Sequence, residues 1–298
     1  MSSVSLNPRG RRLLVALPTL FAPDGSLDLD SCARVGQLVA HSHADGAFIG
    51  GTTGEFLALE PEERLAVFDT QRQALGDKRP IGHVGAGSAR QAVALLEGGL
   101  ALGLTEFAAI TPYYLPASAQ GTWEYFAALS DAIAGRGRLY AYLFQARTTT
   151  MVTPEELSAL ATLPGVVGVK VSGEDLPTVM GYRQATPADF EVFTGNDADF
   201  PQAESHGLDG VVSGVAACFP ATFDSMIAAL NAGDAQAIAT AQADVATAVD
   251  LIAGDIGRIK VGVGLHGIGT PAMRMAIDPP GPEVVEAIRT TVAALEEL

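Results

Sequence analysis

The chain has 298 residues, of which 48% are hydrophobic, 17% charged and 6% aromatic, which argues against disorder and favours a large core of small aliphatic side chains. Its 18 basic and 34 acidic residues give a net charge of −16, which disfavours nucleic acid and anionic membranes as partners. The two cysteines, Cys32 and Cys218, form no CxxC pair, and we find neither a signal-peptide pattern nor a run long enough to span a membrane. We therefore expect a reduced, cytoplasmic location.

Short apolar runs alternate with longer amphipathic segments along the whole chain. Eight of these runs are continuously apolar and are rich in Val, Ile and Ala or bounded by Gly, as is typical of strands buried on both faces. The runs cover residues 13–21, 46–51, 80–87, 106–114, 138–144, 165–173, 190–197 and 210–219.

Helix-start signals lie between the apolar runs. Two starts combine a proline in the first turn with glutamates near the positive end of the helix dipole, and two others offer a Ser or Thr N-cap before an amphipathic stretch over 88–101 or 122–134. The predicted starts are Pro61, Thr153, Ser88 and Thr122.

Strict alternation of eight strands with helices predicts an α/β protein, a (β/α)₈ TIM barrel formed as one domain over residues 1–298. Residues 12–220 would supply the barrel, and residues 221–298 the last barrel helix and additional C-terminal helices. A doubly wound sheet in two domains is the alternative, but no Pro/Ser-rich linker divides the chain. In a TIM barrel the functional residues lie where the strands end.

The second run ends in Gly50-Gly51-Thr52-Thr53-Gly54-Glu55. Glycines allow a ligand to approach the backbone, and successive N–H groups beside threonine hydroxyls suit a carboxylate. A tight strand-to-helix turn explains the same pattern equally well.

The ends of the fourth and fifth runs carry tyrosines and an arginine. Tyr113 and Tyr114 follow Thr111-Pro112 and could relay protons or simply pack. Arg147, five residues beyond Tyr142, could hold a carboxylate in a planar fork or form a surface ion pair.

Lys170 is the sharpest signal, because it lies near the end of an otherwise apolar strand, Gly165-Val166-Val167-Gly168-Val169-Lys170-Val171. Loss of water favours the neutral, nucleophilic amine, which Schiff-base chemistry requires. A lysine whose head reaches solvent at the barrel mouth is the simpler alternative.

Two other patterns carry little weight. Residues 262–267 match G-x-G-x-x-G but no βαβ unit follows them, and the histidines have no metal-ligand spacing. We therefore expect no metal and no cofactor.

Several separated motifs, taken in order, resemble the dihydrodipicolinate synthase / N-acetylneuraminate lyase family of class I, pyruvate-dependent aldolases, over nearly the whole chain. The motifs are Gly51-Thr52-Thr53-Gly54-Glu55, Thr111-Pro112-Tyr113-Tyr114, Tyr142 with Arg147, Gly168-Val169-Lys170, Thr194-Gly195-Asn196-Asp197 and Gly210-Val211-Val212-Ser213.

The resemblance implies a lyase that condenses or cleaves pyruvate with an aldehyde, in a homodimer or homotetramer. By this resemblance Lys170 is the Schiff-base lysine, and Tyr142, Thr52 and Tyr114 relay protons, with Tyr114 crossing from a neighbouring subunit. Further residues implied to bind substrate are Thr53, Gly51, Val212 and Gly195 for pyruvate and Arg147 for the second substrate.

Two segments depart from the usual dihydrodipicolinate synthase pattern, 143–146 before Arg147 and 171–174 after Lys170. Both belong to the half of the site that recognises the second substrate. Arg147 and the Thr52-Thr53 pair favour the activity of a 4-hydroxy-tetrahydrodipicolinate synthase. The altered loop favours the alternative, a 2-oxo-3-deoxy sugar acid aldolase or dehydratase, or an N-acetylneuraminate lyase-like enzyme. A non-catalytic barrel that binds a 2-oxo acid is the alternative of another class, and a phosphate-binding barrel is disfavoured by Asp197 and Asp199 after the seventh run.

Overall fold

The computed structural model describes residues 6–296, and its eight strands form a closed parallel barrel in chain order. The predicted TIM-barrel fold is confirmed. The strands are β1 (Arg12–Ala16), β2 (Gly46–Ile49), β3 (Arg79–His83), β4 (Glu106–Ile110), β5 (Arg138–Leu143), β6 (Val166–Val171), β7 (Glu191–Thr194) and β8 (Gly210–Ser213).

All eight predicted strands exist, but each ends earlier than its apolar run. β1 ends before Pro18 and β4 ends before Pro112, because proline has no N–H to donate and restricts the residue that precedes it. The remaining residues of each run form the loops at the carboxyl ends of the strands, where a barrel enzyme carries its site.

The chain divides into two compact units. The first unit comprises residues up to Pro80 together with those from Ser213 onward, and the second is the continuous segment from Ile81 to Val212. The single domain over 1–298 stays a prediction.

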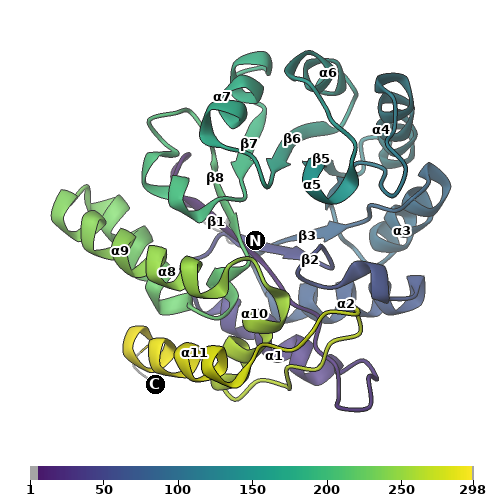
Figure 1. Cartoon of the computed structure of the whole chain (residues 1–298). Helices are drawn as coiled ribbons and strands as arrows, with labels where there is room; N and C mark the ends of the chain where they lie inside the picture. The colour runs from purple at the N-terminus through teal and green to yellow at the C-terminus, as the bar shows by residue number, and fades with distance from the viewer. Residues whose placement is uncertain (1–5, 297–298) are drawn as a thin grey trace. The chain divides into compact units, whose positions relative to one another are not determined.

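The second unit alternates β3 to β8 with helices that lie outside the strands (Figure 1). Its helices are α3 (Ala89–Ala101), α4 (Ala119–Ile133), α5 (Gln145–Thr148), α6 (Pro154–Leu160) and α7 (Leu176–Ala185), with the 3₁₀ turn η2 (Asp197–Gln202).

The predicted caps in this unit are confirmed except at α4. Ser88 caps α3, and Thr153 forms a capping box with Glu156 at the start of α6. The prediction that Thr122 caps a helix is wrong: α4 begins one turn earlier, where the Ser118 hydroxyl accepts a hydrogen bond from Gly121 N at 3.1 Å. Thr122 lies buried in the first turn of α4 instead.

The first unit joins the two ends of the chain. Pro61 opens α2 as predicted, within a capping box formed by Glu60 and Glu63, and the additional C-terminal helices are confirmed (Figure 1). Its helices are α1 (Leu29–Ala40), α2 (Pro61–Ala74), α8 (Pro220–Ala232), α9 (Ala235–Ile252), α10 (Ile256–Leu265) and α11 (Pro282–Leu295), with 3₁₀ turns η1 (Phe56–Ala58) and η3 (Val215–Ala217).

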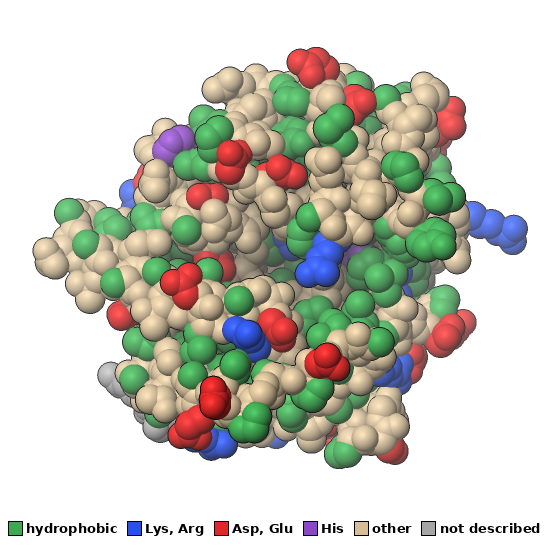
Figure 2. Space-filling model, viewed as in Figure 1, with side chains coloured by type: hydrophobic (Ala, Val, Ile, Leu, Met, Phe, Trp, Pro, Cys, Tyr) green, Lys and Arg blue, Asp and Glu red, His purple; other side chains and the backbone are tan. Residues whose placement is uncertain are grey.

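The G-x-G-x-x-G match lies in α10 and the residues after it. A Cβ at Gly262 would lie 2.5 Å from Cys218 Cβ, so this glycine allows the helix to pack closely. Acidic side chains are dispersed over the face shown in Figure 2 rather than gathered into one patch. No helix among residues 6–296 is long and apolar enough to cross a membrane.

Candidate active site

Lys170 lies near the end of β6, with only 7% of its surface exposed. Its strand neighbours Val169 and Val171 are buried, and the strand register places it opposite Tyr142 of β5. Lys170 Nζ lies 4.2 Å from the centroid of the Tyr142 ring. The structure therefore brings two predicted site residues together on neighbouring strands.

The other two lysines of the chain have structural roles. The Lys78 ammonium donates hydrogen bonds to Ser42 O at 3.0 Å and Ala44 O at 2.7 Å. The Lys260 ammonium pairs with the Glu55 carboxylate and donates to Ala272 O at 2.9 Å. Of the three lysines, only Lys170 lies on a barrel strand.

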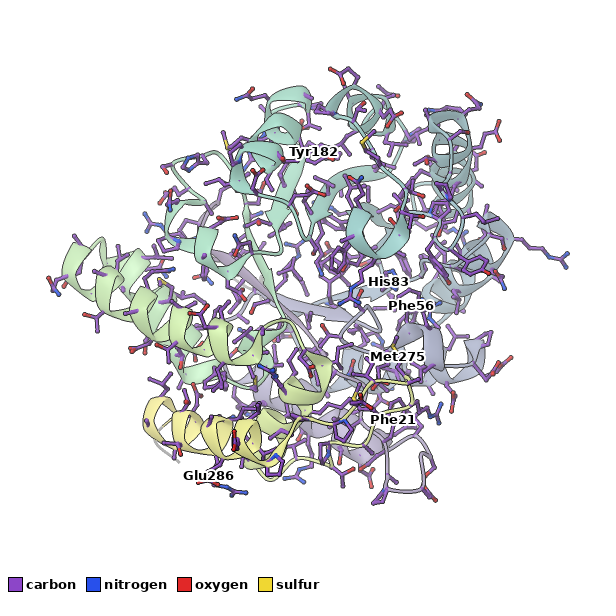
Figure 3. The ribbon with its side chains drawn as sticks, in the orientation of Figure 1. Phe21, Phe56, His83, Tyr182, Met275 and Glu286 are labelled. Atoms are coloured by element: carbon purple, nitrogen blue, oxygen red, sulfur yellow. The ribbon has the colours of Figure 1, made fainter. Side chains whose placement is uncertain are left out.

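Sequence reasoning missed His83, which is labelled in Figure 3 and lies beside Tyr142. The two rings meet edge to face with centroids 6.0 Å apart, and His83 is fully buried at the end of β3. Its Nε2 accepts a hydrogen bond from Ile110 N at 3.2 Å, which assigns the ring proton to Nδ1 of a neutral imidazole. The signal available was a histidine inside an apolar strand. No group of His, Cys, Asp or Glu among the described residues is arranged to hold a metal ion.

A chain of threonine hydroxyls ties the loop after β4 to the loop after β5. Thr111 Oγ1 donates to Thr148 Oγ1 at 3.1 Å, and Thr150 Oγ1 donates to Pro112 O at 2.8 Å while accepting from Ala117 N at 3.0 Å. The two loops that carry Tyr114 and Arg147 are thus held together, a link that the sequence pattern did not reveal.

Tyr114 and Arg147 both lie at the surface of the second unit. Tyr114 is 89% exposed and has a φ of +77°. Non-glycine residues rarely adopt this conformation, and those that do are often found at functional sites. Arg147 lies in the short helix α5, and its guanidinium lies 5.8 Å from the centroid of the Phe144 ring. Tyr114 is therefore not buried beside the lysine within its own chain.

Gly195 and Val212 are closely packed at the ends of β7 and β8. Gly195 N donates to Val171 O at 2.6 Å, and a Cβ at Gly195 would lie 2.4 Å from Ser172 Oγ, so the backbone tolerates no larger residue without a shift. Val212 is buried in β8.

In the first unit, the segment after β2 forms a tight turn, which was one of the two interpretations of its sequence. Glu55 N donates to Thr52 O at 3.0 Å, Phe56 N donates to Gly51 O at 3.4 Å, and Gly50 has a φ of +64°. A Cβ built at Gly51 would meet no atom within 4 Å, so the backbone there is open to approach.

The described chain is a closed parallel barrel with a buried lysine near the end of β6, and comparisons with known proteins identify its family. The family model described as "Dihydrodipicolinate synthetase family" matches residues 9–298, and the chain belongs to this family.

Relatives agree with this placement, and solved structures share the fold. The chain is 31% identical over 229 residues to a 4-hydroxy-tetrahydrodipicolinate synthase of Moorella thermoacetica, covering 76% of this chain and 78% of the relative. It is 29% identical over 292 residues to the synthase of the same name from Cyanothece sp., covering 96% and 98%. A crystal structure of dihydrodipicolinate synthase from Thermotoga maritima shares the fold, with a TM-score of 0.89 at 23% identity over 97% of this chain and 99% of that one. The expected class, a lyase of the Schiff-base-forming aldolase type, is confirmed.

Proposed function

We propose that Lys170 forms a Schiff base with pyruvate and that the resulting enamine condenses with an aldehyde. The position of Lys170 Nζ, buried and 4.2 Å from the Tyr142 ring, carries this proposal. The neutral amine adds to the ketone carbon and water leaves, which gives an iminium. The iminium withdraws electrons, so a methyl proton leaves and the enamine carbon can attack the aldehyde carbon.

Tyr142 is the proposed general acid and base for these steps, because its ring lies directly against the Lys170 amine. Thr52 and Tyr114 complete the proposed relay, as the family resemblance implies. Thr53, Gly51, Gly195 and Val212 are proposed to hold pyruvate, with the Thr53 hydroxyl and backbone N–H on its carboxylate.

The relatives named 4-hydroxy-tetrahydrodipicolinate synthase favour that synthase reaction, with Arg147 binding the carboxylate of the second substrate. One observation favours the alternative, cleavage of a 2-oxo-3-deoxy sugar acid. Phe144, in the altered segment before Arg147, packs so closely on Gly173 that a Cβ there would lie 2.8 Å from its ring. This aromatic ring, 6.2 Å from that of Tyr142, changes the surface on the second-substrate side.

We also propose that the active site is completed by a second copy of the chain. Large apolar side chains are exposed near the joined loops of the second unit: Tyr114, Leu115, Trp123 and Met151. A neighbouring copy would cover these side chains and bring Tyr114 to the partner's site. Sedimentation that shows a fully active monomer would refute this shared site. A tetramer and a cytoplasmic location stay predictions.

Borohydride reduction with pyruvate, followed by peptide mass spectrometry, tests the central proposal. The stable adduct should form on Lys170, because reduction traps the iminium. Lys170→Ala should abolish the adduct, whereas the matched change Lys78→Ala should leave it intact. An adduct that persists in Lys170→Ala would assign the nucleophile to another amine.

A further inference from the structure

The first unit contains a buried ion pair directly beside the proposed carboxylate-binding turn. Glu55 and Lys260 are both fully buried, and their side chains bond to each other. Glu55 is two residues from Thr53 and lies in the left-handed region, with a φ of +51°. Burial lowers the pKa of Lys260, and the hydrogen bond and charge of Glu55 oppose that shift. Such a pair contributes little net stability, so its position suggests a different role.

Glu55 binds backbone as well as the lysine. One carboxylate oxygen, Oε1, faces the Lys260 ammonium. The other, Oε2, accepts two backbone hydrogen bonds, from Arg274 N at 3.0 Å and Met275 N at 2.8 Å. The turn after β2 is therefore anchored to the segment that follows α10.

That segment is itself held firmly. The Arg274 guanidinium forms two hydrogen bonds with the Glu63 carboxylate, at 2.6 and 2.8 Å, and its Nε donates to Gly25 O at 2.7 Å. Both Arg274 and the Lys260 ammonium lie over the Phe21 ring, at 4.5 and 4.3 Å from its centroid. Figure 3 shows Phe21 and Met275 in this same part of the molecule.

We propose that Glu55 is a positioning residue: its bonds to the backbone of residues 274 and 275 fix the Thr52–Thr53 turn, so that the C-terminal extension sets the affinity for the substrate carboxylate. This inference rests on the proposed role of Thr53. Glu55 acts through the turn and needs no contact with substrate. Lys260 neutralises the buried carboxylate and so allows it to serve as the anchor.

Two double variants separate the anchor from the charge pair. Glu55→Gln/Lys260→Met removes both charges but keeps an oxygen that can accept both backbone hydrogen bonds. Glu55→Met/Lys260→Met is similar in size and removes the acceptor. Neither variant leaves a buried charge unpaired, so both are expected to fold.

The readout is the pyruvate concentration that gives half-maximal borohydride-trapped adduct, measured with thermal unfolding of each variant. The Met/Met variant should require about tenfold more pyruvate or above, because two hydrogen bonds to the turn are lost. Its adduct at saturating pyruvate should equal that of the wild type, which a misfolded site would not reach. The Gln/Met variant should stay within about threefold of the wild type.

Controls distinguish this inference from the proposed function. Glu296→Met removes another buried carboxylate of the first unit, which accepts from Ala221 N and Thr222 N, and it should lower the unfolding temperature without changing half-saturation. Thr53→Val should raise the pyruvate concentration that gives half-maximal adduct. Absence of any adduct in the wild type would overturn the proposed function and this inference together.

If the Glu55→Met/Lys260→Met variant reaches half-maximal adduct at the wild-type pyruvate concentration while Thr53→Val needs more, the anchoring role of Glu55 would be overturned and the proposed function would stand. An equal rise in both double variants would also overturn it, because the charge pair would then be the cause. If the Met/Met variant does not fold, Arg274→Gln tests the same link by loosening the anchoring segment at a partly exposed position. Arg274→Gln should raise the half-saturating pyruvate concentration about threefold. An unchanged concentration would overturn the anchoring role of Glu55.

Discussion

The hydroxyl of Tyr142 offers the most direct test of the proposed proton transfer. Tyr142→Phe removes one oxygen and keeps the ring that packs 4.2 Å from Lys170 Nζ and edge to face with His83. Schiff-base formation should therefore survive with unchanged half-saturation by pyruvate. Proton removal from the bound methyl group should slow by about 10²- to 10⁴-fold, since a positioned general acid–base contributes that much. This loss corresponds to roughly 2.7–5.4 kcal/mol in the barrier.

Deuterium uptake into the pyruvate methyl group in heavy water, followed by NMR, measures this step without any aldehyde. Tyr140→Phe is a matched control on the same strand, because Tyr140 is fully buried and its hydroxyl bonds to the Glu191 carboxylate at 2.7 Å. The control should lower the unfolding temperature and leave exchange unchanged. Exchange within threefold of the wild type in Tyr142→Phe would refute the role assigned to the hydroxyl, and His83 would be the next group to test.

Three further predictions follow from named contacts. Arg147→Ala should reduce kcat/KM for a carboxylate-bearing aldehyde about 30-fold or more, and Arg147→Lys should restore little because the planar fork is lost; near-normal kinetics in steady-state assays would favour the sugar-acid alternative. The Arg274 hydrogen bonds lower the pKa of Glu63 below its ordinary 4.5, so their stabilisation is present at neutral pH and is lost as the pH falls through that range. The unfolding temperatures of wild type and Glu63→Gln should therefore differ at pH 7 and converge at low pH, and a constant difference would contradict this linkage. Burial raises the pKa of Cys32 to about 11, so native protein should leave it unmodified by iodoacetamide at pH 8; rapid labelling at Cys32 would show that this part of the core opens.

The fold was predictable because strands buried on both faces form continuous apolar runs, and eight such runs alternate with helix signals. The strand ends were not predictable, since apolar character continues into the loops beyond β1 and β4. Thr122 and Ser118 are both competent N-caps, and residue type alone does not decide between them; the helix begins after Ser118.

The site was predictable where a charged residue type occurs within an apolar stretch of sequence. Lys170 in an apolar strand is such a residue, and the adjacency of β5 and β6 then brings Tyr142 to it. Local sequence patterns could not predict contacts between residues that are distant in the chain. Glu55 and Lys260 are 205 residues apart, and the hydroxyls of Thr111 and Thr148 meet only after two loops have formed.

The discontinuity of the first unit has a consequence for synthesis on the ribosome. The second unit, residues 81–212, is one continuous stretch and can begin to fold as soon as it emerges. The first unit must wait for its C-terminal part, because Glu55 emerges 205 residues before its partner Lys260. At elongation rates of about 5–20 residues per second that interval lasts roughly 10–40 s, during which the segment around Glu55 has no native anchor. The nascent chain is thus expected to depend on chaperones for its first eighty residues and much less for its middle.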